Sequence, residues 1–500
     1  MQQSDQFLMG DVAPGQWQRH AQVLFAHAAR AAVAATLLAI AAPSSGEHPP
    51  ERESAAPPGT DFLPSTYRPL PREDVLISGA TLLDGVGGRH ERYDLLLRDG
   101  RIAAMGSSLP RTEGVRVVQA AGRWLTPGLI DIHSHNGTYM LPVVFENPPT
   151  WDVAEMSNPN VAETDIQHAI NAQDPAFALA LAGGVTTLQV LPGSAPLFGG
   201  RSVVLKTVPG RTMQDMKFPD APQGLKMACG ENPKGNFGSR GQAPTSRQGE
   251  VAVMRAAWQN ARDYLGKWRS VGEPGGRDGG EGGGHGEPPA RDLELETLAG
   301  VLDGKLRVHL HCYTADDIAV MLSIAREFNF KIAAIHHAVE AYKIPDLLQA
   351  AGTCAAVWPD WWGFKMEAFD GIRENAAYLD AAGACTILHS DSLFIGQRLT
   401  LEAAKAMAAG RGAGLDIPRE RAIAWVTSNP AQALGLDDRI GRIALGYNAD
   451  VVLWSGDPFS VYSRPDQVYV DGALAYDRHD PARQPVPDVL LGHPAREDDE

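Results

Sequence analysis

Two histidines separated by one residue stand at the end of an apolar run. They are His133 and His135, in the segment Pro127-Gly128-Leu129-Ile130-Asp131-Ile132-His133-Ser134-His135. The apolar residues predict a β-strand, and residues at i and i+2 of a strand project from the same face. Both imidazoles can therefore reach one ion, which indicates a metal site. The alternative is a strand end with two hydrogen-bonded histidines, because a lone pair of this kind is a weak motif.

Three further apolar runs end in histidine or aspartate. They are Val308 to His311, Ile332 to His337 and Cys385 to Asp391. Four strand ends that carry ligand-type side chains predict one shared centre, so the metal site is favoured over the alternative. In α/β barrels the active site lies where the strands end.

Strands that alternate with helix-period segments predict parallel βα units over residues 126–435. We expect helices over 248–268, 315–328, 371–383, 398–409 and 418–434, with Thr314 capping the second of them. Val203 to Val208 is the weakest of eight expected strands, and the others end near His133, Leu191, Cys229, His311, His337, Trp358 and Asp391. The pattern predicts an α/β fold with a (β/α)8 barrel.

Short alternating strands lie on both sides of the barrel. They cover residues 73–125 and 436–476, and Gly and Asp turns separate them. The simplest arrangement joins the two segments into one small β-sandwich. We expect the Gly-rich stretch 272–289 to be a surface loop inserted in the barrel, and residues 477–500 to be a C-terminal tail.

The first 72 residues are expected to lie outside the fold. The apolar run Ala31 to Ala42 follows Arg19 and Arg30 and matches the central region of a signal peptide, being shorter than the about 20 residues that span a bilayer. We therefore expect a leader over 1–45, a linker over 46–72 and cleavage between Ala41 and Glu47. The mature chain would be exported, for example to a periplasm; a disordered leader on a cytoplasmic protein is the alternative.

The composition limits the partners. The 500 residues are 44% apolar and carry a formal net charge of −16, with a sequence pI near 5.4 and no block of Lys and Arg. This balance disfavours nucleic acids and anionic membranes, so small molecules or dipeptides are the expected ligands. We expect no membrane span in the mature chain, and homo-oligomer formation stays open. The four scattered cysteines predict buried free thiols rather than disulfides.

The order of the motifs resembles the metal-dependent amidohydrolase superfamily, in particular its imidazolonepropionase-like and prolidase-like branch. The resemblance covers about residues 73–476 and rests on PGLIDIHSH, HLHCYTADDI, IHHAVEAYKI, LHSDS, NPAQALGL and GRIALGYNADVVLW. It implies that the HxH pair and histidines of the fifth and sixth strands bind metal. It also implies that an aspartate of the eighth strand is both ligand and proton shuttle. The implied positions are His133, His135, His311, His337 and Asp391.

Three other histidines adjoin these positions. His309 lies two residues before His311 and is expected deeper in the barrel. His336 should face the opposite side of its strand from His337, because side chains alternate along a strand. His389, two residues before Asp391, is expected to support the ligands from behind.

The resemblance leaves the number of metals open. Two-metal members use a bridging carboxylated lysine or glutamate near the fourth strand, and this chain has both Lys226 and Glu231 there. Glu231 is preferred as a ligand because it lies at the C-terminal edge of the predicted strand, where barrel chemistry occurs. The alternatives are a carboxylated Lys226, or a Lys226 paired with a buried carboxylate while Glu231 contacts substrate or solvent.

The predicted chemistry is hydrolysis of a C–N bond. Zinc is the default ion for a histidine-rich site, and iron, manganese or nickel also suit these ligands. Such an ion lowers the pKa of bound water from about 15.7 toward 7. Asp391 is expected to be the catalytic base, with His337 as the second catalytic residue.

Four residues of the expected barrel rim are candidates for substrate binding because they could hold a carboxylate or an aromatic group: Arg201, Tyr313, Tyr342 and Trp362. An exported chain fits intracellular histidine breakdown poorly, so we expect hydrolysis of N-acyl amino acids or dipeptides. The alternatives are a cyclic-amide hydrolase or deaminase with the same site, and a metal-bearing binding protein without turnover.

Overall fold

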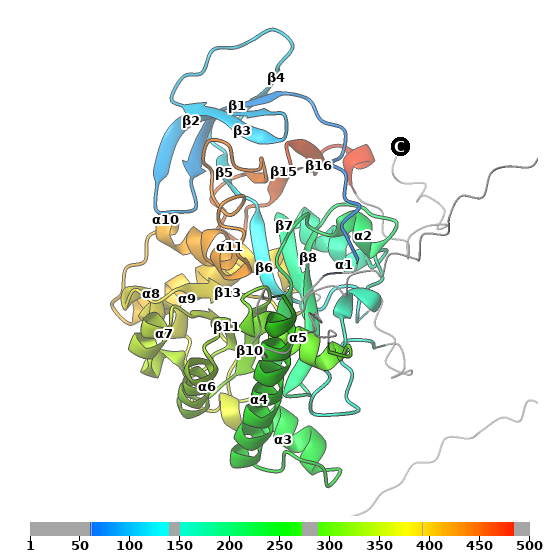
Figure 1. The fold of residues 1–500 in the computed structure, drawn as a ribbon. Coiled ribbons are helices and arrows are strands. Elements are labelled where there is room, and N and C mark those ends of the chain that lie inside the picture. The colour runs from blue at the N-terminus through cyan, green and yellow to red at the C-terminus, as the bar shows by residue number, and fades with distance from the viewer. Residues whose placement is uncertain (1–60, 62, 140–150, 273–288, 393, 485–500) are drawn as a thin grey trace, which may run out of the picture. The chain divides into compact units, whose positions relative to one another are not determined.

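A computed structural model describes residues 61, 63–139, 151–272, 289–392 and 394–484, all within one unit that spans residues 55–500 (Figure 1). The expected leader, most of the linker, residues 273–288 of the Gly-rich stretch and most of the tail lie outside the described residues. None of the helices in the described ranges combines the length and hydropathy that crossing a bilayer requires.

The central sheet has eight strands in sequential order and nearly closes into a barrel. Its strands are β6 (Leu129–Ser134), β7 (Val185–Val190), β8 (Phe198–Lys206), β9 (Gly224–Ala228), β10 (Arg307–Cys312), β11 (Ile332–His337), β12 (Cys354–Val357) and β13 (Thr386–Leu388). The amide of Asp391 donates to the carbonyl of His133 at 2.9 Å, which joins the end of β13 to β6. All eight expected strands, including the weakest, are therefore present.

One strand runs against the expected parallel order. Strand β8 is antiparallel to both β7 and β9, whereas the other neighbouring pairs are parallel. The connection between β7 and β8 is residues 191–197. A parallel crossover takes a dozen or more residues, so this connection can only return the chain as a hairpin.

Helices surround the barrel strands. The helix predicted from Thr314 is confirmed as α6, and the Thr314 hydroxyl accepts from the amide of Asp317 at 3.3 Å. The segment predicted as one helix over 418–434 is divided among α10, η6 and α11. The α-helices are α1 (Pro175–Ala182), α2 (Met213–Met216), α3 (Glu231–Gly238), α4 (Arg247–Gly272), α5 (Leu293–Leu302), α6 (Ala315–Phe328), α7 (Pro345–Ala351), α8 (Asn375–Ala381), α9 (Leu399–Gly412), α10 (Arg419–Ala422) and α11 (Ser428–Leu434). The 3-10 helices are η2 (Ile166–His168), η3 (Ala341–Lys343), η4 (Met366–Ala368), η5 (Gly396–Arg398), η6 (Ile423–Val426) and η7 (Pro481–Arg483).

A second sheet unites the two flanking segments. Its order is β16-β15-β14-β5-β1-β2-β3, with β4 also paired to β1, and Figure 1 shows the early and late strands side by side. The strands are β1 (Val75–Leu83), β2 (Arg89–Arg98), β3 (Arg101–Gly106), β4 (Arg116–Gln119), β5 (Trp124–Pro127), β14 (Val451–Trp454), β15 (Pro465–Val470) and β16 (Ala473–Asp477). The two segments therefore pair as one connected sheet, and the β-sandwich stays a prediction.

Buried contacts hold this sheet against the barrel. Val452 and Trp454 of β14 belong to the same apolar core as the barrel residues. The ammonium of Lys206 on β8 lies 3.3 Å from Asp450 and 3.1 Å from Asp471, and all three residues are buried. At Gly128, between β5 and β6, a Cβ would lie 2.1 Å from the hydroxyl of Thr186, so only glycine allows β6 to pass so close to β7.

The expectation of free thiols is wrong. Cys229 is bonded to Cys312 and Cys354 to Cys385, with Cα separations of 5.3 and 4.5 Å. Both separations are usual for disulfides. The partners are 83 and 31 residues apart in sequence, and only the pairing of β9 with β10 and of β12 with β13 brings them together.

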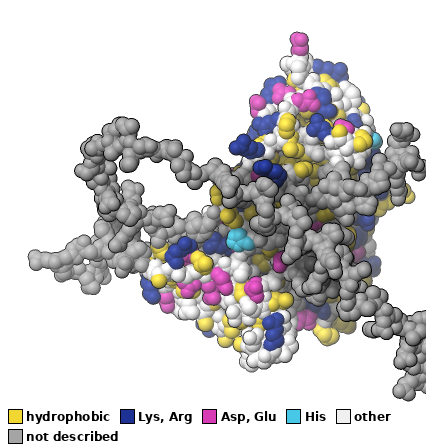
Figure 2. Space-filling view, turned by 90° about the vertical axis from the view of Figure 1, so that its right-hand side faces the viewer, with side chains coloured by type: hydrophobic (Ala, Val, Ile, Leu, Met, Phe, Trp, Pro, Cys, Tyr) yellow, Lys and Arg dark blue, Asp and Glu magenta, His cyan; other side chains and the backbone are white. Residues whose placement is uncertain are grey.

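The surface carries charges of both signs. In the uncovered part of the face shown in Figure 2, Lys and Arg side chains are interspersed with Asp and Glu.

Candidate metal centre

Seven buried histidines gather inside the barrel and at the C-terminal ends of its strands. They come from β6, β10, β11 and the residues directly after β6 and β13, and they are His133, His135, His309, His311, His336, His337 and His389. The ring of His133 lies 5.0 Å from that of His337 and 5.0 Å from that of His389. The four strand ends singled out by the sequence thus converge on one place.

Asp391 closes this cluster. Its carboxylate lies 3.1 Å from Nε2 of His135 and 3.5 Å from Nε2 of His133, and 3.9 Å from Nε2 of His337. Two overlapping sets of residues could each hold an ion, because the ligand atoms within each set lie within 4.8 Å of one another. One set is His133, His337 and His389, and the other is His133, His135 and Asp391. His311 adjoins them, with its ring 4.5 Å from that of His337.

The donor set fits a divalent ion. Both ring nitrogens of His311, both of His389 and Nδ1 of His337 are buried without a hydrogen-bond partner. An unsatisfied buried polar group costs about 1–3 kcal/mol, so several of them in one place indicate a ligand that they coordinate. Neutral imidazoles with a carboxylate are the ligands that zinc and related ions prefer.

Burial keeps these imidazoles neutral. It lowers the pKa of His389 to about 4 and holds the pKa values of His133, His311 and His337 well below the ordinary value. The nearby ammonium of Lys226 lowers the pKa values of all four further. Neutral rings offer the lone pairs that coordination requires.

Unusual backbone conformations aim two of the ligands. His337, Ala338 and Asp391 have φ values of 71°, 41° and 46°, which residues other than glycine adopt rarely. Such conformations cluster at functional sites. At the end of β11 this conformation breaks the alternation of side chains, so His336 and His337 both face the cluster. The expectation that His336 faces away is therefore wrong.

Hydrogen bonds beneath the cluster orient the ligands. Nδ1 of His336 lies 3.0 Å from Nδ1 of His133, and Nε2 of His336 lies 3.0 Å from Nδ1 of His309. Nδ1 of His135 lies 2.8 Å from the carbonyl oxygen of Leu191. That carbonyl can only accept, so Nδ1 of His135 carries the proton and Nε2 is free to act as a ligand.

Asp131 ties the loop that carries Asp391 to β6. One carboxylate oxygen accepts from the amides of His133 and Ser390, both at 3.2 Å, and the hydroxyl of Ser390 donates to the other. Burial raises the pKa of Asp131 to about 6, although these donors favour its charged form. This side chain positions both ends of the ligand set.

The structure brings Lys226, and not Glu231, to the histidines. Lys226 is fully buried on β9, beside His309 in the strand register, and its ammonium donates to the carbonyl of Pro192 at 3.0 Å. Burial lowers its pKa to about 8. Glu231 begins α3 after a turn at Gly230 with φ of 82°, and its carboxylate pairs with Lys365 at 3.2 Å.

The four expected substrate residues have different environments. Arg201 is buried on β8 and donates to the hydroxyl of Thr297 at 2.9 Å, while the Tyr342 hydroxyl donates to the carbonyl of Asp370 at 3.1 Å. Tyr313 stacks on His337 with a centroid separation of 5.3 Å. Trp362 lines a small pocket with His337. Tyr313 and Trp362 thus lie at the candidate centre, whereas Arg201 and Tyr342 are held by other protein groups.

Sequence reasoning missed two features of the centre. His389 was expected behind the ligands, yet it shares a ligand set with His133 and His337. The LHSDS motif could have indicated this, because His389 and Asp391 follow the same strand. Trp358 was named only as a strand end and not as a site residue, although the centre of its ring lies 4.0 Å from that of His337. The dense run of tryptophans after β12 was the available signal.

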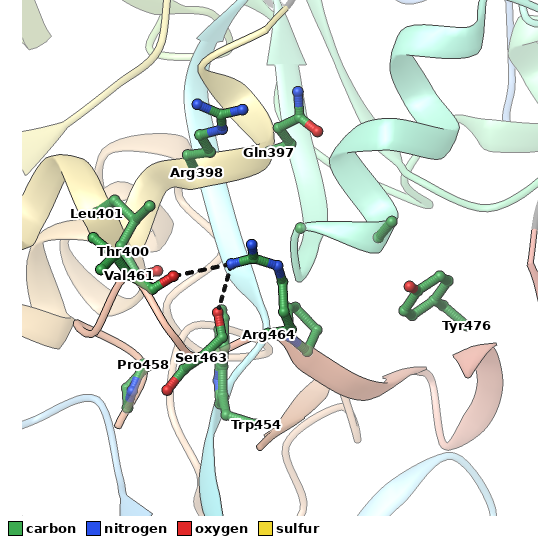
Figure 3. A pocket seen from close by; sticks show the side chains of 13 residues that line it. Gln397, Arg398, Thr400, Leu401, Trp454, Pro458, Val461, Ser463, Arg464 and Tyr476 are labelled. Carbon is green, nitrogen blue, oxygen red and sulfur yellow. Dashed lines mark hydrogen bonds between the residues drawn. The ribbon is translucent and has the colours of Figure 1, made fainter. Parts of the chain in front are cut away.

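A second pocket of about 530 Å³ lies beside β14 (Figure 3). Its lining comes from the end of α1, the start of α9 and the region of β14 to β16. One guanidinium nitrogen of Arg464 there donates to the carbonyls of Val461 and Ser463 at 3.1 and 3.2 Å. None of the predicted site residues is among the described residues that line this pocket.

Comparisons with known proteins point to one family. The model of the amidohydrolase family matches residues 296–476. The solved structure of an amidohydrolase from Thermotoga maritima MSB8 is similar with a TM-score of 0.72 and 32% identity, and covers 81% of this chain and 100% of that one.

Two curated relatives extend the similarity. Amidohydrolase tasK of Hapsidospora irregularis is 33% identical over 410 residues, which is 79% of this chain. The chain spans only 41% of the length of that relative. An imidazolonepropionase of Stenotrophomonas maltophilia (strain R551-3) is 26% identical over 403 residues, covering 75% of this chain and 89% of the relative.

Proposed function

Because the chain belongs to the amidohydrolase family, we propose that this metal-dependent hydrolase of C–N bonds acts on N-acyl amino acids or dipeptides outside the cytoplasm. The observation that carries the proposal is the convergence of His133, His135, His337 and Asp391 at ligand distances. The amide substrate class and the location go beyond the family itself and are the points to test.

The ion would be held by the histidine cluster. His133, His135, His337, His389 and Asp391 supply the ligand sets within 4.8 Å, and His311 adds a further imidazole beside them. When bound, a divalent ion would act as a Lewis acid that polarises the carbonyl and lowers the pKa of water toward 7. Zinc remains the default, with iron, manganese or nickel as alternatives, at one or two ions per chain.

We favour Lys226 over Glu231 as the bridging position of a two-ion site. The support is placement, since Lys226 lies among the histidines while Glu231 is paired with Lys365 at the start of α3. In this assignment the neutral amine of Lys226 would add carbon dioxide and lose a proton, and the resulting carbamate would provide the anionic oxygens that a bridge needs. Glu231 then holds Lys365 in place.

Proton transfer is assigned to Asp391. Its carboxylate faces His133, His135 and His337 and is partly exposed, so it can reach both water and substrate. It accepts the proton of the attacking water and delivers it to the nitrogen of the leaving amine. His337 holds the carboxylate on one side. Asp131, through Ser390, fixes the loop from which Asp391 extends.

Export is proposed from two independent features. Disulfides persist mainly in oxidising compartments, and the chain has two of them. The apolar run Ala31 to Ala42 matches a signal peptide. Cleavage between Ala41 and Glu47 would release the mature chain, in whose surroundings peptide-derived amides are more available than intermediates of cytoplasmic pathways.

A second candidate is hydrolysis of a cyclic amide. The similarity to an imidazolonepropionase over 75% of the chain favours it. The same cluster could serve either reaction, because both need a polarised carbonyl bonded to nitrogen.

The test combines metal analysis with a substrate panel. Elemental analysis of purified protein should find about one to two divalent ions per chain, and a His133→Ala, His135→Ala double variant should lose at least one. His168→Ala, which changes an exposed histidine of η2, is the matched control and should retain full metal content.

The panel comprises dipeptides, N-acyl amino acids and cyclic amides, each assayed with and without chelator. A true substrate should reach kcat/KM of about 10³ M⁻¹s⁻¹ or more. If only the cyclic amides are hydrolysed, the second candidate function, hydrolysis of a cyclic amide, replaces the first. A metal content below a tenth of an ion per chain after metal reconstitution would refute the proposed metal site itself.

A further inference from the structure

We propose that the candidate centre selects substrates with a bulky apolar group next to the scissile bond. That group would be bound by an aromatic rim, defined as Tyr313, Trp358, Trp361, Trp362 and Phe364. The inference rests on the proposed function, because it names the substrate class of the same site.

The rim begins at a ligand residue. The rings of Trp358 and His337 stack with centroids 4.0 Å apart and an interplanar angle of 22°. Trp361 stacks on Trp358 at 4.7 Å and 17°, and Phe364 lies 6.0 Å from Trp358 and 6.4 Å from Tyr313. One continuous aromatic surface therefore leads from the cluster outward.

The outer part of the rim is exposed. Tyr313 and Trp358 are buried, whereas Trp362 and Phe364 expose 50% and 54% of their surface. Met366 and Phe369 of the same segment expose 79% and 70%. Apolar side chains gathered in this way mark binding sites, because isolated ones are usual but groups of them are disfavoured in water.

The occupant of the rim is argued from its continuity with the centre. Trp358, Trp361 and Trp362 line a small pocket in which His337 is also a wall residue. The pocket holds only about 10 Å³, about the space of one water, so the apolar group lies on the exposed outer rings, which continue inward to His337 through the stacked Trp358. The molecule on the rim is therefore the one on which the centre acts.

Two cations contact the rings of the rim. The guanidinium carbon of Arg373 lies 5.7 Å from the ring centre of Trp362. The ammonium of Lys365 lies 3.2 Å from Glu231, 2.7 Å from the side-chain oxygen of Asn232 and 3.9 Å from the ring centre of Tyr313. Lys365 is thus neutralised by a carboxylate, and both cations are engaged by a ring. Lys365 fastens the segment to α3 and holds the rim in a preformed shape.

The experiment measures chain-length dependence in two substrate series on the metal-loaded protein. One series varies the acyl group from acetyl to butyryl, hexanoyl and benzoyl on a fixed glycine, and the other varies the amino-acid side chain under a fixed acetyl group. Burial of each methylene is expected to raise kcat/KM roughly threefold to fourfold in at least one series.

Two variants of exposed rim residues remove the proposed contacts. Phe364→Ser and Trp362→Ser should each lower kcat/KM for the longest substrate at least fivefold more than for the acetyl-glycine standard. Tyr462→Ser is the control, because Tyr462 is 91% exposed and lies between β14 and β15. It should leave both values unchanged.

Binding provides a second readout without turnover. Hexanoate should quench the tryptophan fluorescence at a concentration at least 10-fold lower than acetate requires. Phe364→Ser should remove this difference. Equal rates across both series, in an enzyme whose hydrolysis is chelator-sensitive, would overturn the rim proposal and leave the function standing. Failure to hydrolyse any amide would overturn the function, while the hexanoate preference would still decide the rim.

Discussion

Removal of the disulfide between Cys229 and Cys312 should weaken both the fold and the metal centre. The bond joins the C-terminal ends of β9 and β10, and Cys312 directly follows His311. The other bond, between Cys354 and Cys385, joins the opposite, N-terminal ends of β12 and β13. The two bonds thus differ in their distance from the ligands, and each controls for the other.

The expected loss of stability follows from loop closure. The partners are 83 residues apart, and a cross-link over such a loop removes about 4.5 kcal/mol of chain entropy from the unfolded state. The bond over 31 residues gives about 3.7 kcal/mol by the same relation. For a folded unit of this size the unfolding entropy is about 0.9 kcal/mol/K, so the expected drops in Tm are roughly 5 and 4 °C.

The assay compares two double variants, Cys229→Ser with Cys312→Ser, and Cys354→Ser with Cys385→Ser. Both should lower Tm by similar amounts, but only the first should also lower the affinity for the metal, measured by competition with a chromophoric chelator. Thiol titration of the native protein, unfolded without reductant, should detect no free thiol. Detection of four free thiols would refute the reasoning, as would equal metal affinities in the two variants.

Three other changes test the site and its surroundings. Asp391→Asn should lower kcat by roughly 100-fold or more with an unchanged thermal unfolding curve; near-normal turnover would remove Asp391 as the base. Lys226→Met should lower occupancy of a second metal more than Glu231→Gln does, and the opposite ranking in elemental analysis would restore Glu231. Burial raises the pKa of Glu250, which accepts from the amide of Gly230, from 4.5 to about 7. The folded protein therefore favours protonated Glu250, and the stability that this preference contributes is complete below pH 4.5 and is lost as pH rises through 7. Between pH 4.5 and 7 the Glu250→Gln variant should lose less unfolding free energy than the native protein, by up to about 3 kcal/mol. Parallel pH profiles of unfolding free energy for the two proteins would contradict this.

Local patterns were sufficient to predict the barrel strands and the helix from Thr314. Apolar runs and a capping threonine act over a few residues, so the sequence displays them directly. The direction of β8 depended instead on the length of the connection 191–197, which forces a hairpin. The disulfides depended on strand order, which brings Cys229 to Cys312 only after β9 and β10 pair.

The candidate site was predictable where the candidate ligands lie at the ends of strands. His133, His135, His337 and Asp391 do so, and they meet in the structure. Glu231 lies where a strand end was expected, but the turn at Gly230 carries it into α3.

Side-chain direction at irregular backbone was not predictable from the sequence. His336 faces the cluster because it lies opposite His311 in the strand register, and the positive φ of His337 turns the next side chain toward the cluster as well.

The pairing of β14 with β5 has a consequence for the order of folding. Val452 lies opposite Thr126, so the barrel sequence is inserted between two strands of one sheet. During synthesis the edge of β5 has no partner until residues near the end of the fold emerge. Non-local pairing of this kind is slow to form, and unpaired edges attract other chains. A chaperone that covers β5 during that interval, or secretion in an unfolded state, would keep nascent chains from associating with one another.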